Sequence, residues 1–171
     1  PTGLSITIDD DATYSNSTGV TLTLAATGAS QMRFKNESTG IWSNYETYST
    51  AKTWTLVNTQ GTRTVYAQFK DAAGNETDGL TMDEIILDSI APSAPMLSAP
   101  ANGTYTNDTT PTFTWGLVTG ASSYQIQVDD NSNFSSVTDS YTGSNTVDTT
   151  TTLSNGTTYY WRMKARDAAQ N

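Results

Sequence analysis

The chain has 171 residues, a formal net charge of −9 at pH 7, and neither cysteine nor histidine. This acidic balance argues against a nucleic-acid partner, whose phosphates require a basic face, and against an anionic membrane surface. About a fifth of the residues are Thr, which is β-branched and favours strands, and 10% are aromatic, which is more than disordered chains carry. We therefore expect a folded all-β protein in an extracellular or cell-surface location.

The first half of the chain reads as a ladder of short strands that alternate apolar and polar residues. Turn residues separate these strands at the spacing of an all-β sandwich, and no stretch has helical periodicity. The expected strands are Leu4–Ile8, Val20–Leu24, Met32–Phe34, Trp54–Val57, Thr64–Lys70 and Ile85–Leu87, with an irregular aromatic segment around Trp42, Tyr45 and Tyr48.

A proline-rich linker follows, because three of the five prolines lie between residues 92 and 100. Such a segment should be extended and stiff, which suits a rod of domains. We place the domain boundary here, with domain 1 at residues 1–91 and domain 2 at residues 92–171.

In the second half, the expected strands are Pro111–Trp115, Ser123–Val128 and Thr158–Arg166, with weaker strands near Val137 and Val147. No further strand follows Thr158–Arg166. The second sandwich therefore lacks its last strand within this chain, which leaves an edge unpaired. Because the chain begins with Pro1 and not with Met, we expect a processed product or an excised fragment.

A long internal repeat supports two domains of one kind. Val65–Asn75 returns as Tyr159–Asn171, and each copy is an alternating strand that runs into an Asp-Ala-Ala-x-Asn turn. The period of roughly 95 residues is that of one small β-sandwich. The second copy departs from the first at one turn position, where Gln170 stands in place of Gly74.

These segments carry a resemblance to two known families. Domain 1 resembles the immunoglobulin-like repeats of bacterial and archaeal surface proteins, and domain 2 resembles the fibronectin type III-like modules that accompany them. The matching segments are Asn16–Leu24, Gln31–Phe34, Trp42, Tyr45, Thr64–Asn75, Leu87–Pro92, Pro100–Gly103, Thr110–Trp115, Gly120–Tyr124 and Gly156–Arg162. The resemblance implies two tandem immunoglobulin-like/fibronectin type III-like β-sandwiches, a fold that hosts many unrelated functions.

The sequence does not favour an enzyme. It contains no phosphate-binding glycine loop and no Gly-x-Ser-x-Gly elbow. The pair Asp129–Asp130 has the chemistry of a glycosidase, but its neighbours Asn131, Ser132 and Asn133 are typical of a turn in which Asp bonds to the backbone.

Calcium is the metal that the acidic loops favour, because Ca²⁺ takes six to eight oxygen ligands. The resemblance to adhesin repeats implies that Asp71 and Asp88 lie near the domain junction, where they could bind it. The alternative is that Asp71 and Asn75 satisfy the backbone of their own turn while Asp88 ends a strand. A second candidate metal site is the acidic triplet Asp9, Asp10 and Asp11, for which the alternative is a solvated turn.

Two features point to carbohydrate. Exposed rings of Trp42, Tyr45 and Tyr48 could stack on sugar faces, although Trp42 could equally pack over an open edge of the sandwich. Seven Asn-x-Ser/Thr sequons are candidate glycosylation sites, although a chain this rich in Asn, Ser and Thr also forms sequons by chance. They are Asn16, Asn36, Asn75, Asn102, Asn107, Asn133 and Asn155.

The sequence thus predicts a non-catalytic structural segment, such as a stalk, adhesin or filament subunit. Its partners are neighbouring domains or identical subunits of a surface assembly. The edge beside Thr158–Arg166 could accept a strand of a neighbouring chain, such as Leu4–Ile8, and so assemble head-to-tail; the alternative is that the polypeptide continues. A second interpretation is a carbohydrate-binding accessory module of a secreted enzyme, which requires Trp42, Tyr45 and Tyr48 to be exposed in one plane.

Overall fold

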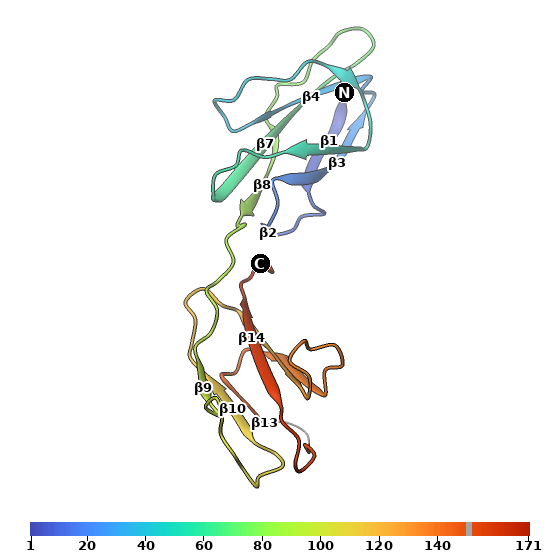
Figure 1. Cartoon of the computed structure of the whole chain (residues 1–171). Coiled ribbons are helices and arrows are strands. Elements are labelled where there is room, and N and C mark those ends of the chain that lie inside the picture. The colour runs from blue at the N-terminus through green and yellow to red at the C-terminus, as the bar shows by residue number, and fades with distance from the viewer. Residues whose placement is uncertain (150–151) are drawn as a thin grey trace. The chain divides into compact units, whose positions relative to one another are not determined.

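The computed structural model describes residues 1–149 and 152–171, which form strands, turns and loops without a helix (Figure 1). These residues divide into two compact units, unit 1 at Pro1–Ser89 and unit 2 at Ile90–Asn171. The boundary lies two residues before the one placed from the sequence. The strands of each unit form two sheets, so the all-β fold class with tandem β-sandwiches is confirmed.

Unit 1 is a sandwich of a three-stranded and a five-stranded sheet, with strand orders β1-β3-β6 and β2-β8-β7-β4-β5. Its strands are β1 (Thr2–Ile8), β2 (Tyr14–Ser15), β3 (Gly19–Thr27), β4 (Gln31–Asn36), β5 (Glu46–Thr47), β6 (Ala51–Thr55), β7 (Gly61–Lys70) and β8 (Thr81–Leu87). β2 runs parallel to β8, and every other pairing in this unit is antiparallel. The chain therefore changes sheets between β1 and β2.

The core of unit 1 follows from alternation along the strands, because successive side chains of a strand point to opposite faces. On β4, Met32 and Phe34 point inward, and on β7 the inward residues include Ala67 and Phe69. Phe34 and Phe69 have no exposed surface. The partly buried Trp54 packs against Phe34 with a centroid distance of 5.5 Å.

Unit 2 is a smaller sandwich with sheet orders β13-β10-β9 and β12-β11-β14. Its strands are β9 (Leu97–Ala99), β10 (Thr112–Trp115), β11 (Ser123–Asp129), β12 (Asp139–Gly143), β13 (Val147–Thr149) and β14 (Tyr160–Arg166). Alternate residues of β10 and β11 point into a separate apolar core. The buried residues of this core are Phe113, Trp115, Tyr124, Ile126, Val128 and Ala165.

β14 has one paired edge. It pairs with β11 over its full length, from Arg166 opposite Ser123 to Tyr160 opposite Asp129. Within the described residues it pairs with no other strand, whereas β7 at the same place in the repeat lies between β4 and β8. The described part of unit 2 therefore has the unpaired edge that the sequence predicted.

Some strand bounds differ from those expected. The strand expected at Trp54–Val57 is β6, which begins and ends earlier because β3 sets its register, with Val20 opposite Trp54 and Thr23 opposite Ala51. Leu56 lies beyond the strand but is still buried. The short strands β2, β5 and β9 were not expected, since two or three residues are too few to show alternation.

The buried aromatic ring of Phe69 should carry much of the stability of unit 1. We expect Phe69→Ala to destabilise unit 1 by about 3–5 kcal/mol, because it removes a fully buried ring and leaves a cavity. Urea unfolding followed by two-dimensional NMR resolves the two units. Phe113→Ala is the matched variant and should instead destabilise unit 2; equal effects of Phe69→Ala on both units would contradict separate cores.

Candidate functional sites

The outer face of the five-stranded sheet in unit 1 carries cationic, amide and aromatic side chains. β4 alternates its buried apolar residues with Arg33 and Lys35, and β7 alternates its own with Tyr66, Gln68 and Lys70. The register places Arg33 opposite Gln68 and Lys35 opposite Tyr66. Three of the eight Lys and Arg residues of this acidic chain thus lie on one face.

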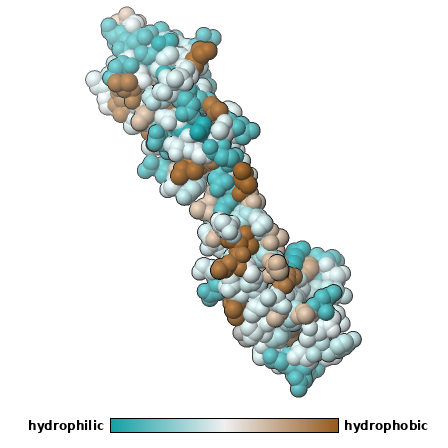
Figure 2. Space-filling model, turned by 90° about the vertical axis from the view of Figure 1, so that its left-hand side faces the viewer, coloured by the Kyte–Doolittle hydropathy of each residue, from teal (hydrophilic) through white to brown (hydrophobic). Residues whose placement is uncertain are grey.

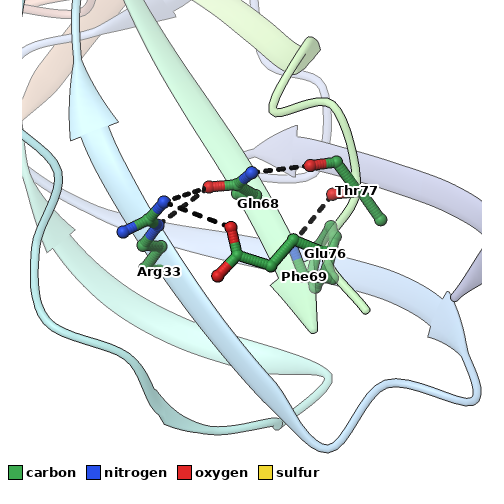
Figure 3. Close-up of polar contacts among 5 residues, drawn as sticks. All are labelled: Arg33, Gln68, Phe69, Glu76 and Thr77. Atoms are coloured by element: carbon green, nitrogen blue, oxygen red, sulfur yellow. Dashed lines mark hydrogen bonds and ion pairs between the residues drawn. The ribbon is translucent and has the colours of Figure 1, made fainter. Parts of the chain in front are cut away.

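A hydrogen-bond chain crosses this face from β4 to the loop before β8 (Figure 3). Arg33 donates from Nε and Nη2 to Gln68 Oε1, at 2.8 and 2.6 Å, and Gln68 Nε2 donates to the Thr77 carbonyl at 2.6 Å. Thr77 also returns two hydrogen bonds to Phe69, through its backbone N–H and its hydroxyl oxygen. Glu76 lies 3.7 Å from Arg33 Nη2. The chain ties the β7–β8 loop to the sheet.

Aromatic rings interleave with the cations on the same face. Arg33 lies 4.5 Å from the ring centroid of Tyr45 and 5.2 Å from that of Trp42. The Lys70 and Lys35 ammonium groups lie 4.0 and 5.1 Å from Tyr45 and Trp42 respectively. Lys35 is also 5.0 Å from Tyr66. We call this set the cation–aromatic ladder; its members are Lys70, Tyr45, Arg33, Trp42, Lys35 and Tyr66.

The ladder encloses the Tyr45 phenol. Its oxygen is buried and has no hydrogen bond of good geometry among the described residues. Burial raises the pKa of the Tyr45 phenol, the Glu76 carboxylate beside it adds to the rise, and the Arg33 guanidinium opposes it. Tyr45 is therefore a packed, neutral ring held between cations.

This arrangement corrects the expected sugar platform. Trp42 and Tyr45 are half-buried and covered by cations, and Tyr48 belongs to the other side of the sheet. The Tyr48 ring packs on Phe69 at 6.0 Å, and its hydroxyl accepts a hydrogen bond from the Ala26 N–H at 3.1 Å. The three rings do not lie exposed in one plane, because Tyr48 packs against the core while Trp42 and Tyr45 lie against cations on the outer face. The alternative of a carbohydrate-binding accessory module stays a prediction.

Asp71 closes the turn after β7. Its Oδ1 accepts hydrogen bonds from the backbone N–H groups of Ala73 and Asn75, and its Oδ2 accepts one from Asn75 Nδ2 at 2.9 Å. The hydrogen bond from the Asn75 side chain is the main reason that the pKa of Asp71 lies below its ordinary value. Gly74 takes a positive φ of 90° in this turn. We call this arrangement the Asp–Asn clasp.

The second copy of the repeat forms the same clasp. Asp167 accepts from the backbone N–H and from Nδ2 of Asn171, each at 3.0 Å. Gln170 adopts a φ of 67° where the first copy has glycine. The Asp-Ala-Ala-x-Asn motif is thus a strand terminator in both units, and its acid binds its own turn.

The other metal candidates lie in a turn (Asp9, Asp10 and Asp11) and directly after strand β8 (Asp88). Asp9, Asp10 and Asp11 have φ values of 48°, 57° and 67°, and Asp9 Oδ1 accepts a hydrogen bond from the Thr21 N–H at 2.7 Å. The Asp88 N–H donates to the Ser15 carbonyl. No three acidic, His or Cys side chains of residues 1–149 and 152–171 come together as a metal ligand set. Calcium binding stays a prediction.

Asp129 anchors a loop in unit 2. It has no exposed surface, and its carboxylate accepts hydrogen bonds from the N–H groups of Asn131 and Ser136 at 3.2 and 3.0 Å. Burial raises the pKa of Asp129, but the backbone donors outweigh it and the pKa lies below its ordinary value. This carboxylate therefore organises the loop at residues 129–136, and it is not directed into a cleft.

The remaining surface offers shallow features. An open groove of about 520 Å³ lies beside β1 and the start of β8, lined by Leu4, Ile6, Leu80 and Met82 among others. On the face shown in Figure 2, apolar residues form separate patches among polar ones. No described helix is long and apolar enough to cross a membrane.

The segment expected to donate a strand is already used. Leu4–Ile8 lies within β1, which pairs with β3, and Ile6 and Ile8 are 5% and 0% exposed in the core of unit 1. Extracting them costs about 2 kcal/mol for each side chain. Leu4–Ile8 is therefore not a free donor, and any strand that completes β14 must come from elsewhere.

Sequence reasoning missed the ladder and its hydrogen-bond chain. A signal was present, since Arg33 and Lys35 alternate with Met32 and Phe34 and must therefore share the outer face. The partner Gln68 is 35 positions away, and only the register between β4 and β7 shows that the two side chains meet.

The Arg33 guanidinium should not be replaceable by another cation. We expect Arg33→Lys to destabilise unit 1 by about 1–2 kcal/mol, because a single ammonium cannot supply both donors to the buried Gln68 oxygen or stack between two rings. Urea unfolding measures this. Lys52→Arg is the control, because Lys52 forms a partly exposed ion pair with Glu46 and should change stability by less than about 0.5 kcal/mol. Equal effects would remove the special role of Arg33.

The Asp–Asn clasp should make stability depend on pH. Because the folded pKa of Asp71 is lowered, its ionised form stabilises unit 1 above the unfolded pKa of about 3.9, and this contribution is lost as the pH falls through the folded value. Asp71→Asn should therefore unfold at a lower temperature than the parent chain at pH 7, and the gap should shrink towards pH 3. Circular dichroism melts at several pH values measure it; a gap that is the same at all of them contradicts the assignment.

No protein-family model matches the chain, and no curated protein matches it. Similar solved structures are fibronectin type III modules. The FN1–FN3 domains of chicken CNTN1 match 98% of the chain at 14% identity and a TM-score of 0.60; the chain covers 62% of that fragment. The fibronectin(III)-like modules of Clostridium thermocellum CbhA match 96% of it at 15% identity and a TM-score of 0.51, with 87% of that chain covered. At these identities the likeness shows the fold, which is a fibronectin type III/immunoglobulin-like β-sandwich.

Proposed function

We propose that this chain is a non-catalytic structural segment of an extracellular or cell-surface protein, such as a stalk, adhesin or filament subunit. The observation that carries the proposal is that charged side chains that could act in catalysis or binding are instead hydrogen-bonded to other residues of this chain. Arg33 binds Gln68, Asp71 binds its own turn, and Asp129 holds its own loop. These side chains stabilise strands, turns and loops, which is what we expect of a structural module.

The surface composition supports an extracellular setting. The chain is acidic, rich in Thr and Ser, and free of Cys, so its stability depends on packing and not on a redox environment. Its two units have separate apolar cores. Tandem modules with their own cores can be repeated along a polypeptide without loss of stability, which is what a spacer requires.

The open edge of β14 supports a place within a larger assembly. In unit 1 the equivalent strand β7 is covered by β8, which carries acidic Asp83 and Glu84 among apolar residues. β14 presents basic Arg162, Lys164 and Arg166. A strand that carries acidic residues, as β8 does, would extend the sheet and pair its charges with those of β14. We assign its supply to a neighbouring domain or an identical subunit.

Hydrogen exchange tests this proposal on the parent protein. In the 171-residue chain, the amides of β14 that do not point to β11 should exchange as fast as those of a loop, because nothing in the described residues bonds to them. In the parent protein in its native assembly, the same amides should be protected. The amides of β11 serve as the control, because they lie between two strands in both samples. If these β14 amides exchange as fast in the parent protein as in the 171-residue chain, the proposal that another strand completes this edge is wrong.

A further inference from the structure

One aromatic ring of unit 2 is fully exposed. Tyr105 has 100% of its surface in contact with solvent and lies in the loop between β9 and β10, away from the core of its unit. By contrast, Tyr124 is buried in that core and Tyr159 packs against it. A large apolar ring without any contact raises the question of what covers it.

Tyr105 stands two residues before the sequon Asn107-Asp108-Thr109. Residues 104–106 form neither a turn nor a strand, and Asn107 lies at a bend that follows them. Only Thr106 separates Tyr105 from Asn107, so a sugar on the Asn107 amide is within reach of the ring. The turn that follows is held by other groups: the Asp108 N–H donates to Thr106 Oγ1, and the Thr110 N–H donates to Asp108 Oδ1. The exposed Asn107 amide takes no part in the hydrogen bonds of the described residues.

Several other sequons use their amides in the fold. Asn36 donates to the Thr55 carbonyl and accepts from Trp54 Nε1, at 2.9 and 2.8 Å. Asn75 belongs to the Asp–Asn clasp, and Asn133 accepts from the Ser135 N–H. A sugar on these nitrogens or beside these oxygens would break or crowd bonds that the structure makes.

The exposed sequons differ in the residue two positions earlier. The residue two positions before Asn102 is Pro100, and the residue two positions before Asn155 is Leu153, so neither sequon has an aromatic residue there. Tyr14 lies two positions before Asn16, but it is only 39% exposed because it lies on β2. Asn107 is the sequon that combines a free amide with a fully exposed ring.

We propose that Asn107 is a site of N-linked glycosylation and that the first sugar of the glycan packs on the Tyr105 ring. One face of a pyranose ring presents C–H bonds, which suit the negative face of an aromatic ring. Contact between them covers apolar surface that unit 2 otherwise leaves in water. The inference deepens the proposed function and rests on it, because N-glycosylation requires export.

The modification itself is a group transfer. Asn107 Nδ2 forms a bond to the anomeric carbon of a sugar carried by a lipid pyrophosphate, an external donor that an oligosaccharyl transferase supplies. The bond from that carbon to the pyrophosphate oxygen breaks, the lipid pyrophosphate leaves with the electron pair, and Nδ2 loses one proton. Nothing is oxidised or reduced, so the step needs no further co-reactant.

A double-mutant cycle tests the packing. The whole chain is secreted from a eukaryotic cell line, its glycans are trimmed to a single N-acetylglucosamine, and mass spectrometry reports the occupancy of Asn107. With this sugar on Asn107, we expect Tyr105→Ala to lower the unfolding temperature of unit 2 by about 2–5 °C. In an Asn107→Gln background the same change should have no effect, and Tyr105→Phe should behave as the parent chain because it keeps the ring.

Asn102 provides the matched control, since it lies in the same exposed loop without an aromatic neighbour. Asn102→Gln should leave the effect of Tyr105→Ala unchanged. Lack of coupling between Tyr105 and Asn107, or an unmodified Asn107 in the secreted chain, overturns the inference. A parent protein that is not exported from its native cell would overturn the proposed function instead, and the coupling measured in the secreted chain would still stand.

Discussion

The register between β4 and β7 is the constraint on which unit 1 depends. It sets Phe34 opposite Ala67 and Met32 opposite Phe69, and so it fills the core from both strands. The same register sets Arg33 opposite Gln68 on the outer face. A slip by one residue would bury the cations and expose the aromatic core, so the apolar side and the polar side specify the same pairing. The ladder therefore adds specificity to a sheet whose inner face already determines its alignment.

The sequence predicted the features that depend on local residue patterns, which are the longer strands and the repeated turns. Alternation located β4, β7, β10 and β11, and Phe113, Trp115, Tyr124 and Ile126 on the last two strands are buried. It misplaced β6, because an apolar run at Trp54–Val57 resembles a strand and only the pairing with β3 reveals its true bounds. The repeat identified both clasps as equivalent turns, but hydrogen bonds had to show that the acids bind their own backbone.

The candidate sites were harder to predict because their character depends on contacts distant in sequence. Trp42 and Tyr45 read as available rings in a polar segment, yet cations from β4 and β7 cover them. In an acidic chain with eight Lys and Arg residues, placing three of them against aromatic rings leaves few for partners. Arginine is weakly hydrated and planar, so it loses little when it is stacked in this way. Arg33, Lys35 and Lys70 of unit 1 thus stabilise the sheet by packing against its aromatic rings.

The sheet change at Asp9, Asp10 and Asp11 has a mechanical consequence. Because the chain turns there into the other sheet, β2 runs parallel to β8, with hydrogen bonds from the Ile86 and Asp88 N–H groups to the Thr13 and Ser15 carbonyls. The chain passes through β1 before it reaches β2, and it leaves unit 1 after β8. Tension applied to the start of β2 and the end of β8 would therefore pull these parallel strands along their own axes in opposite directions. Their hydrogen bonds would bear the load together, in shear, and would not open one at a time like a zip.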